Sequence, residues 1–325
     1  MIKPIPNTDQ IKIKPEFEQR YKKLLEDRYE EFIKYSLSFL RRSIRVNKLK
    51  KSVPYVKKKL ENQGWKLIQI PWCKHGYWIE HARGRRDIGN TREHALGYFY
   101  VQEAASMIPP IVLKPKPQEL VLDMCAAPGS KTTQIGEYMK NKGILIANDY
   151  QGSRLRSLGI NTQRIGLTNT LITKMYGQAF KKNNILFDRI LLDAPCSGTG
   201  TIRKSIKTLR IWNPTMITRL SHTQKTLIES AYESLKPQGL LVYSTCSNEP
   251  EENEEVVDHL LEKYPDAKLE KIMLDVKRSP LILEFKEKKY SQEIKRCVRL
   301  WPQDNDTEGF FIAKIRKSLF PLEKY

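Results

Sequence analysis

From about residue 95 onward, short apolar runs alternate with segments of helical periodicity, and this alternation constrains the fold more than any other feature of the sequence. Buried strands are predicted at 120–124, 144–148, 170–173, 189–193 and 240–244. Helices are predicted near 130–141, 152–165, 215–235 and 250–263. Short buried strands that alternate with helices are typical of βαβ units and of a mainly parallel sheet. Residues 297–301 and 309–315 are expected to form an antiparallel, hairpin-like end.

The part before residue 95 has a different character. A chain of 325 residues is long enough for about two domains and for a core without disulfides. The first 40 residues place Phe17, Tyr21 and Leu25 at helical spacing, which predicts one or two amphipathic helices. The sequence therefore predicts a helical segment over 1–40, a basic α+β domain over 41–94 and a doubly wound α/β domain over 95–325.

Positive charge is concentrated in the predicted α+β domain. The chain has 57 Lys and Arg against 37 Asp and Glu, a formal net charge of +20. Segment 41–66 holds ten cations and one acid, and the aromatic residues interleaved here and just beyond are Tyr55, Trp65, Trp72, Tyr77 and Trp78. Cations that neutralise phosphates and rings that stack on unpaired bases suit RNA. The alternatives are charge for general solubility and aromatic side chains as the core of a small domain.

Several classes of protein do not fit this sequence. No run of about 18 apolar residues predicts a membrane span, and the first residues lack the apolar segment of a secretory signal. The five cysteines are widely spaced, without a Cys-x-x-Cys pair, which argues against a zinc site and a disulfide framework. Because free thiols favour a reducing compartment, we expect a cytoplasmic protein.

A turn of small residues after the first predicted strand of the α/β part has the features of a ligand-binding loop. Segment 125–133 opens a helix, so that its backbone N–H groups can approach a ligand. It is not a P-loop, because Ser130 separates Gly129 from Lys131. The next strand ends at Asp149, where an acid suits ribose hydroxyls. These features indicate a nucleoside cofactor; the alternative is a helix cap beside a surface aspartate.

Two further strands each deliver a cysteine at the carboxyl edge of the sheet. Asp193 and Cys196 follow the fourth predicted strand, and Cys246 follows the fifth. Ligands bind at this edge of open α/β sheets, so both thiols can face one pocket. A carboxylate and a thiol side by side are poor core material, although a lone cysteine in such a sheet is usually a small core residue. The acids from Glu251 to Glu255 are expected to complement the dipole of the next helix.

These segments resemble the Nop/Sun-type RNA cytosine-5 methyltransferases. The resemblance covers about residues 40–317 and depends on 43–50, 97–107, 121–133, 187–200, 240–254 and 308–314. Its most specific part is the pair of Pro-Cys and Thr-Cys motifs that contain Cys196 and Cys246. The resemblance implies a Rossmann-like methyltransferase domain that uses S-adenosylmethionine, preceded by an RRM-like RNA-binding domain.

The chemistry that the resemblance implies is covalent catalysis. A thiolate adds to C6 of cytosine, which makes C5 nucleophilic enough to take a methyl group; loss of the C5 proton and of the thiol completes the cycle. By resemblance Cys246 is the nucleophile and Cys196 assists product release. Asp193 is expected to hydrogen-bond the N3/N4 edge of the base, and Lys131 to lie near the base and the thiol, where a cation lowers a thiol pKa.

The resemblance also implies the cofactor site. The loop lines the methionine and ribose portion, Asp149 holds the ribose hydroxyls, and Arg154 follows on the next helix. The expected cofactor-binding residues are Cys125, Ala126, Ala127, Pro128, Gly129, Ser130, Lys131, Asp149, Arg154, Tyr176 and Asp193. The family often has an aspartate for the adenine amino group where this chain has Tyr176. A tyrosine can stack on adenine or offer its hydroxyl, but it is not an anion at pH 7.

Three other functions share part of this pattern. DNA cytosine-5 methyltransferases use the Pro-Cys thiol and carry Glu-Asn-Val, whereas Glu252 and Asn253 are followed by Glu254. Amino methyltransferases need a second proline and an aromatic residue after Asp193. A non-catalytic RNA-binding assembly factor would not need both cysteines together with Asp193 and Lys131.

The expected partner is RNA, with an unpaired or flipped-out cytosine as target. tRNA is favoured because no long additional RNA-binding extension is present, and rRNA is the alternative. No metal and no membrane are expected, and a monomer is favoured.

Overall fold

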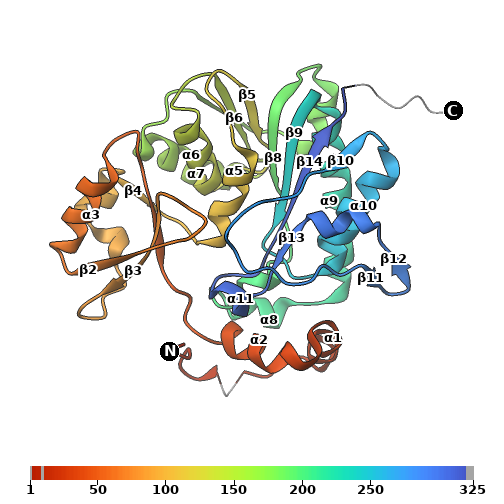
Figure 1. Ribbon diagram of the computed structural model, residues 1–325, viewed down its shortest axis with the longest axis horizontal. Coiled ribbons are helices and arrows are strands. Elements are labelled where there is room, and N and C mark those ends of the chain that lie inside the picture. Colours follow the sequence, from red (N-terminus) through yellow and green to blue (C-terminus); the bar gives the residue numbers. More distant parts are fainter. Residues whose placement is uncertain (1, 9–10, 320–325) are drawn as a thin grey trace.

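The computed structural model describes residues 2–8 and 11–319 and contains two main sheets (Figure 1). The strands of the larger sheet are β5 (Leu120–Asp123), β6 (Ile144–Asn148), β7 (Thr170–Thr173), β8 (Phe187–Asp193), β9 (Leu235–Thr245), β10 (Ala267–Leu269), β13 (Val298–Leu300) and β14 (Phe310–Lys317). Their order is β10-β14-β9-β8-β5-β6-β7, with β13 paired to β14. Strands β5 to β9 are parallel, and β14 runs antiparallel to β9 and β13. The predicted parallel sheet and its antiparallel end are confirmed.

Helices cover both faces of this sheet, so the predicted doubly wound α/β fold is confirmed. The helices around it are α5 (Ile108–Leu113), α6 (Ser130–Tyr138), α7 (Gly152–Ile165), α8 (Lys207–Ile211), α9 (Pro214–Glu233), α10 (Glu254–Lys263) and α11 (Pro302–Asn305). Short 3-10 helices lie at Ala105–Met107, Gly177–Lys182, Thr199–Thr201, Pro250–Glu252 and Gln292–Arg296, and a small hairpin pairs β11 (Glu284–Phe285) with β12 (Lys288–Lys289).

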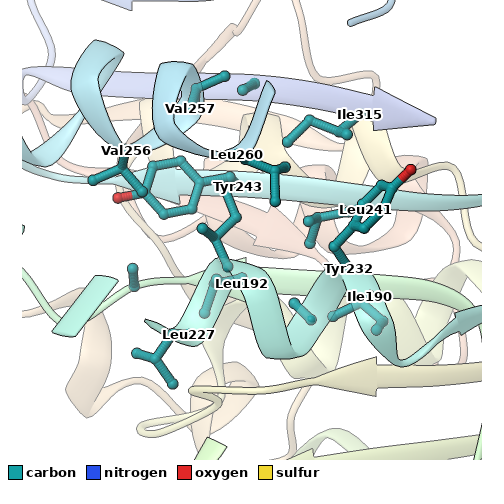
Figure 2. Close-up of a cluster of buried hydrophobic side chains, with 14 of the residues drawn as sticks. Ile190, Leu192, Leu227, Tyr232, Leu241, Tyr243, Val256, Val257, Leu260 and Ile315 are labelled. Atoms are coloured by element: carbon teal, nitrogen blue, oxygen red, sulfur yellow. The ribbon is translucent and has the colours of Figure 1, made fainter. Parts of the chain in front are cut away.

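Neighbouring strand residues enter opposite halves of the core. Leu192 and Tyr243 pack under α9 and α10 together with Leu260, as Figure 2 shows. Leu191 and Val242 belong instead to the cluster that includes residues of α5 and α6. Because successive side chains of a strand point to opposite faces, a strand covered on both faces must be apolar throughout. This is why these strands read as continuous apolar runs.

The smaller sheet has the order β2-β3-β1-β4 and is antiparallel throughout. Its elements are β1 (Ser43–Val46), α3 (Val53–Glu61), β2 (Trp65–Gln69), β3 (Gly76–His81), a 3-10 turn at Ile88–Asn90, α4 (Arg92–Ala95) and β4 (Phe99–Val101). This β-α-β-β-α-β sequence of elements is the ferredoxin-like arrangement, which agrees with the RRM-like expectation. The sheet includes β4 and therefore extends past residue 94, where the basic domain was expected to end.

Both faces of the smaller sheet are buried. Ile44 and Phe99 pack with Leu60 of α3, whereas Trp72 and Trp78 pack with residues of α5 and the large sheet. The interleaved aromatic residues Trp65, Trp72, Tyr77 and Trp78 are therefore core residues, and the hypothesis that their rings stack on RNA bases is wrong. Tyr55 is the exception, with 40% of its surface exposed.

The first 40 residues form α1 (Pro15–Leu25), a 3-10 turn (Glu26–Arg28) and α2 (Tyr29–Ser36), as the helical spacing predicts. Phe17, Tyr21 and Phe32 pack against Trp212 and Trp301 of the larger domain. The two helices thus lie below the large sheet in Figure 1 and are anchored to it. Of the helices in 2–8 and 11–319, none is both long and apolar enough to cross a membrane.

Candidate active site

The carboxyl ends of the central strands open into a cavity of about 600 Å³. Eight residues predicted from the sequence line it: Cys125, Ala127, Asp149, Arg154, Tyr176, Asp193, Cys196 and Cys246. The lining also includes residues that sequence reasoning missed, among them Asn148, Tyr150, Gln178, Arg219 and Thr223. Its position agrees with the rule that open α/β sheets bind ligands at this edge.

The two strand-end thiols meet in this cavity. The pairing of β8 with β9 sets Asp193 opposite Ser244, so Cys196 and Cys246 follow from adjacent strand ends. Their Sγ atoms are 3.3 Å apart, which is hydrogen-bonding contact and far longer than a disulfide bond. The hydrogen bond to Cys246, together with burial, raises the pKa of the Cys196 thiol well above its ordinary value. Cys196 therefore keeps its proton and can donate it to Cys246.

A buried ion pair lies beside the thiols. Lys131 Nζ is 2.7 Å from Asp193 Oδ2, and Ser244 Oγ donates a hydrogen bond of 2.8 Å to Asp193 Oδ1. Burial lowers the pKa of Lys131, but the charges of Asp193 and Cys246 outweigh burial and raise it. Lys131 is thus a permanent cation close to both groups. A fixed cation favours the thiolate form of a neighbouring cysteine.

Cys125 is the third thiol in the cavity, and its surroundings are opposite in sign. Burial and the carboxylates of Asp123, Asp149 and Asp193 raise its pKa. A thiol held in its protonated form is a poor nucleophile. Cys125 is therefore suited to lining the cavity and unsuited to attack.

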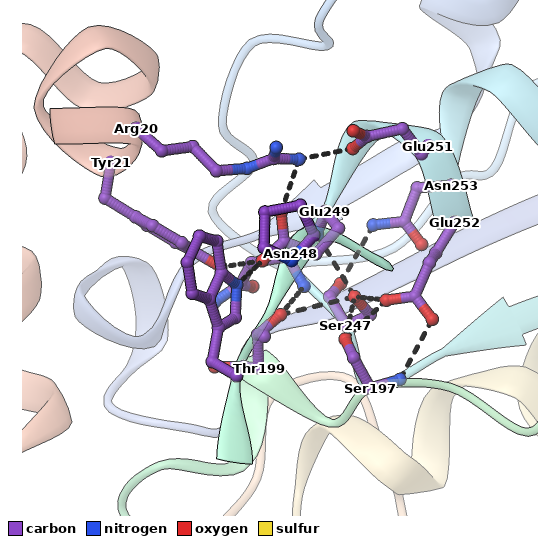
Figure 3. Close-up of polar contacts among 12 residues, drawn as sticks. Arg20, Tyr21, Ser197, Thr199, Ser247, Asn248, Glu249, Glu251, Glu252 and Asn253 are labelled. Carbon is purple, nitrogen blue, oxygen red and sulfur yellow. Dashed lines mark hydrogen bonds and ion pairs between the residues drawn. The ribbon is translucent and has the colours of Figure 1, made fainter. Parts of the chain in front are cut away.

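One carboxylate ties the two cysteine loops together (Figure 3). Glu252 Oε1 accepts hydrogen bonds from the Ser197 backbone N–H at 2.9 Å and from Gln224 Nε2 at 3.0 Å. Its Oε2 accepts from the hydroxyls of Ser197 and Ser247. Because these serines directly follow Cys196 and Cys246, Glu252 holds both loops in one arrangement.

The acids around Glu252 do more than the sequence predicted. Glu249 accepts hydrogen bonds from Tyr21 Oη at 2.7 Å and Trp212 Nε1 at 2.9 Å, and Arg20 pairs with Glu249 and Glu251 (Figure 3). Glu254 and Glu255 do lie in the first turn of α10. For Glu251 and Glu252 the predicted helix-dipole role is wrong, since they precede this helix and bind α1 and the cysteine loops. A feature of the sequence that could have indicated these contacts is the dense run of acidic residues in an otherwise basic chain.

Hydrogen bonds with two side chains outside it fix the loop between β5 and α6. Asp149 Oδ2 accepts from the Ala127 backbone N–H at 3.2 Å and lies 3.2 Å from Arg154 Nη1, while Arg154 also donates to the Ala127 carbonyl. Gly129 has φ +103° and leads into α6. The remaining predicted residues Ala126, Pro128, Gly129, Ser130 and Lys131 shape this turn or begin the helix and do not line the cavity.

Two aromatic residues that follow β6 and β7 line the cavity as a pair. Tyr150 and Tyr176 are stacked, with ring centroids 5.8 Å apart and an interplanar angle of 22°. They are 46% and 70% exposed, so their rings are accessible from the cavity and from solvent. Tyr150 was missed, although an aromatic residue directly after the strand-end acid Asp149 was a usable signal. Across 2–8 and 11–319, no group of three His, Cys, Asp or Glu side chains could hold a metal ion.

Comparison with known proteins matches two parts of the chain. Residues 110–316 match the family described as 16S rRNA methyltransferase RsmB/F, and residues 13–104 match the N-terminal domain of 16S rRNA methyltransferase RsmF. The chain is 49% identical to the tRNA (cytosine(49)-C(5))-methyltransferase of Pyrococcus abyssi, over 94% of this chain and 97% of that protein. It is 45% identical to ribosomal RNA small subunit methyltransferase F of Shewanella piezotolerans, over 89% of this chain but only 60% of that longer protein.

Solved structures agree with this result. A methyltransferase homolog protein from Pyrococcus horikoshii superposes with a TM-score of 0.83 at 39% identity, covering 93% of this chain and 94% of that one. NSun6 from Pyrococcus horikoshii, solved with SFG, superposes with a TM-score of 0.83 at 25% identity, covering 94% and 98%. Because the family match spans well over half of the sequence, the chain belongs to the RsmB/F family of methyltransferases, the Nop/Sun type to which its two strand-end cysteines pointed.

Proposed function

We propose that this protein transfers a methyl group from S-adenosylmethionine to C5 of cytosine in RNA through a covalent bond between Cys246 and C6. The observation that carries the proposal is the 3.3 Å contact between the thiols of Cys196 and Cys246, with the Lys131–Asp193 ion pair beside them. Relatives that match most of this chain are named as methyltransferases of cytosine 49 in tRNA and of small-subunit rRNA.

The residues of the cavity suit S-adenosylmethionine. Asp149 lies at the end of β6, where an acid reaches ribose hydroxyls, and the stacked rings of Tyr150 and Tyr176 offer a surface for a purine. Tyr176 replaces the anionic acceptor that the family often has, so adenine is held here by stacking more than by a carboxylate. When bound, the cofactor supplies an electrophilic methyl group.

Each protein group then has one task. The Cys246 thiolate, next to the Lys131 cation, attacks C6, and the C5–C6 double bond becomes nucleophilic at C5. Asp193 accepts from the N4 amino group, and its lysine partner keeps it oriented. After C5 takes the methyl group, its proton passes to a water molecule, the electrons of that C–H bond re-form the C5–C6 double bond, and the bond between C6 and Cys246 breaks with its electrons on sulfur. Cys196, which has kept its own proton at neutral pH, donates it to the departing sulfur and regains a proton from solvent.

The division of labour along the chain is part of the proposal. The helical segment 1–40 braces the loop after Cys246, the basic domain from residue 41 positions RNA, and the remainder carries out methyl transfer. Because both faces of the smaller sheet are buried, RNA meets this domain through its cations and loops. The five free thiols favour a reducing compartment, which supports a cytoplasmic location as part of the proposal.

tRNA is the proposed substrate and rRNA the second candidate. The relative named as a tRNA methyltransferase is 49% identical to this chain, and the relative named as an rRNA methyltransferase is 45% identical. Bisulfite sequencing of total RNA treated with the purified protein tests both, because 5-methylcytosine resists deamination. Protected cytosines in rRNA alone would contradict the tRNA assignment.

A trapping experiment tests the mechanism. The Cys196→Ala variant is mixed with S-adenosylmethionine and total cellular RNA and run on a denaturing gel. We expect a slowly migrating protein–RNA adduct that is absent from the Cys196→Ala/Cys246→Ala variant. No adduct, together with no methylation by the wild-type protein despite cofactor binding, would contradict the proposal.

A further inference from the structure

A second hollow, larger than the cofactor cavity, lies between the segments that flank the N-terminal helices, the smaller sheet and the larger domain. This groove has a volume of about 1010 Å³ and is lined by residues from 5–7, 39–43, 101–103 and 203–210, with Ile11, Arg86 and Glu308. It shares no lining residue with the cofactor cavity. The mechanism proposed above does not use it.

The floor of the groove is directly connected to the catalytic centre. Glu308 lines the groove, and the next residue, Gly309, donates its N–H to the Gly200 carbonyl at 2.9 Å. Gly200 in turn donates its N–H to the carbonyl of Cys246, also at 2.9 Å. A Cβ atom on Gly200 would lie 2.3 Å from the Gly309 oxygen, so the three segments are in close backbone contact. Two backbone hydrogen bonds therefore separate the residue after Glu308 from the backbone of Cys246.

The groove is lined by more cations than carboxylates, since Glu103 and Glu308 are the acids in its lining. Lys204, Lys207 and Arg210 are exposed and make no ion pair or side-chain hydrogen bond with any residue of 2–8 and 11–319. Arg42 and Arg86 bond to backbone carbonyls instead of carboxylates. Arg42 donates to the carbonyl of Arg86, so the two cations are neighbours, and burial together with the charge of Arg42 lowers the pKa of Arg86. Such crowding of like charge favours an anion between them.

Apolar side chains also line the groove. They are Ile5 and Ile11 from the N-terminal segment, Phe39 and Leu40 from the stretch before β1, and Val101 from β4. Val101 is 36% exposed, and the guanidinium of Arg86 lies 4.7 Å from the centroid of the Phe39 ring. The groove therefore combines exposed cations with apolar surface for flat, weakly polar groups.

We propose that this groove holds the unpaired RNA strand that adjoins the target cytosine, with its phosphates on Lys204, Lys207 and Arg210 and its bases against the apolar side chains. A single strand presents phosphates and base faces on different sides, whereas a duplex hides its base faces within the stack. The inference rests on the proposed function, since it gives the substrate strand a path to Cys246.

The experiment measures binding of a labelled oligocytidylate of eight nucleotides as a function of salt. The test variant carries Lys204→Ala, Lys207→Ala and Arg210→Ala. The control carries Lys116→Ala, Lys140→Ala and Lys142→Ala, three exposed lysines that precede β5 and β6 at the opposite edge of the sheet. Each phosphate contact on a single strand contributes about 0.7 to the slope of log K against log salt, so the test variant should lose about 2 from this slope. The control should retain the wild-type slope.

Methyl transfer supplies the second readout. We expect the test variant to raise KM for tRNA at least tenfold, with kcat and the affinity for S-adenosylmethionine within about twofold of wild type; equal thermal unfolding temperatures would show that it folds. A test variant with the slope and KM of the control would overturn the proposal. So would the absence of wild-type binding at about 50 mM salt, or equally strong competition by polyglutamate, which has charge but no bases.

The two proposals fail in distinguishable ways. In one outcome, the wild-type protein binds the oligonucleotide with a salt slope that depends on the three cations but methylates no RNA. The proposal that the groove binds RNA is then supported, and the enzymatic proposal fails. If the wild-type protein methylates RNA, and replacing the three cations by alanine changes neither the salt slope of binding nor KM, the enzymatic proposal is supported. The groove is then not the path of the RNA strand.

Discussion

The loops that follow β8 and β9 have similar sequences, Pro-Cys-Ser and Thr-Cys-Ser, and lie side by side at one edge of the sheet. Their thiols touch, yet their surroundings differ. The Lys131 cation interacts with Cys246, whereas Cys196 has a raised pKa and lies near the negative charge of Glu252. Both loops are fastened to Glu252 through Ser197 and Ser247.

The charged groups around each cysteine therefore distinguish the two thiols. A fixed cation stabilises negative charge on the groups around it, and a thiol whose pKa is raised, as that of Cys196 is, keeps its proton and can act as an acid. Two residues of the same type, 3.3 Å apart, can therefore serve as nucleophile and proton donor. Four predictions test this difference, beginning with the largest effect.

Cys246→Ala should abolish methyl transfer, by about 10⁴-fold or more, because no other group can form the bond to C6. The affinity for S-adenosylmethionine, measured by calorimetry, should remain within about threefold of wild type. The matched control is Cys125→Ala, which removes a thiol from the same cavity. Full activity of Cys246→Ala, together with inactivity of Cys196→Ala, would reverse the two roles.

Cys196→Ala should slow turnover by about 10²-fold through loss of the proton donor, while bond formation to RNA continues. In a single-turnover experiment the covalent adduct should therefore form at a rate close to wild type and then persist. An adduct that forms slowly and never accumulates would show that Cys196 acts before the bond is made.

Glu252→Ala should misalign both loops, because it leaves the Ser197 and Ser247 hydroxyls without their shared acceptor. We expect a loss of about 3 kcal/mol in the free energy of unfolding and a fall in kcat with little change in KM for RNA. Glu252→Gln, which keeps an acceptor oxygen, should recover most of the stability in urea titrations. Equal kcat in wild type and both variants would mean that the clamp does not position the thiols.

Substitutions at the aromatic pair should leave the cysteine chemistry intact and weaken only cofactor binding. Tyr150→Ala and Tyr176→Ala should each raise the Kd for S-adenosylmethionine by about three- to tenfold, the loss of one stacking contact. The control is Tyr55→Ala, an exposed tyrosine on α3. An unchanged Kd in both variants would remove the pair from the site.

Local sequence pattern predicted the parallel strands of the larger domain and the helices between them, but not the short elements α5, α8, β10 and α11. Strands β6 and β7 and helix α7 begin and end where they were predicted, because buried strands and amphipathic helices differ in periodicity over a few residues. Strand β9 is longer than predicted, since it begins at Leu235 through a polar stretch that lacks the apolar pattern. The strand ends brought Asp193, Cys196 and Cys246 together as expected, because parallel strands share one carboxyl edge.

Three properties could be predicted from the sequence: the order of the main strands and helices along the chain, the carboxyl edge of the sheet as the place of the reactive groups, and the family resemblance of their motifs. Only the tertiary structure decided that Glu252 clamps two loops, that Arg20 reaches Glu249 and Glu251, and that the tryptophans of the smaller sheet are buried. These contacts join residues as much as 231 positions apart. Periodicity reports which face of an element is apolar, but the partner that covers that face is chosen by packing between distant segments.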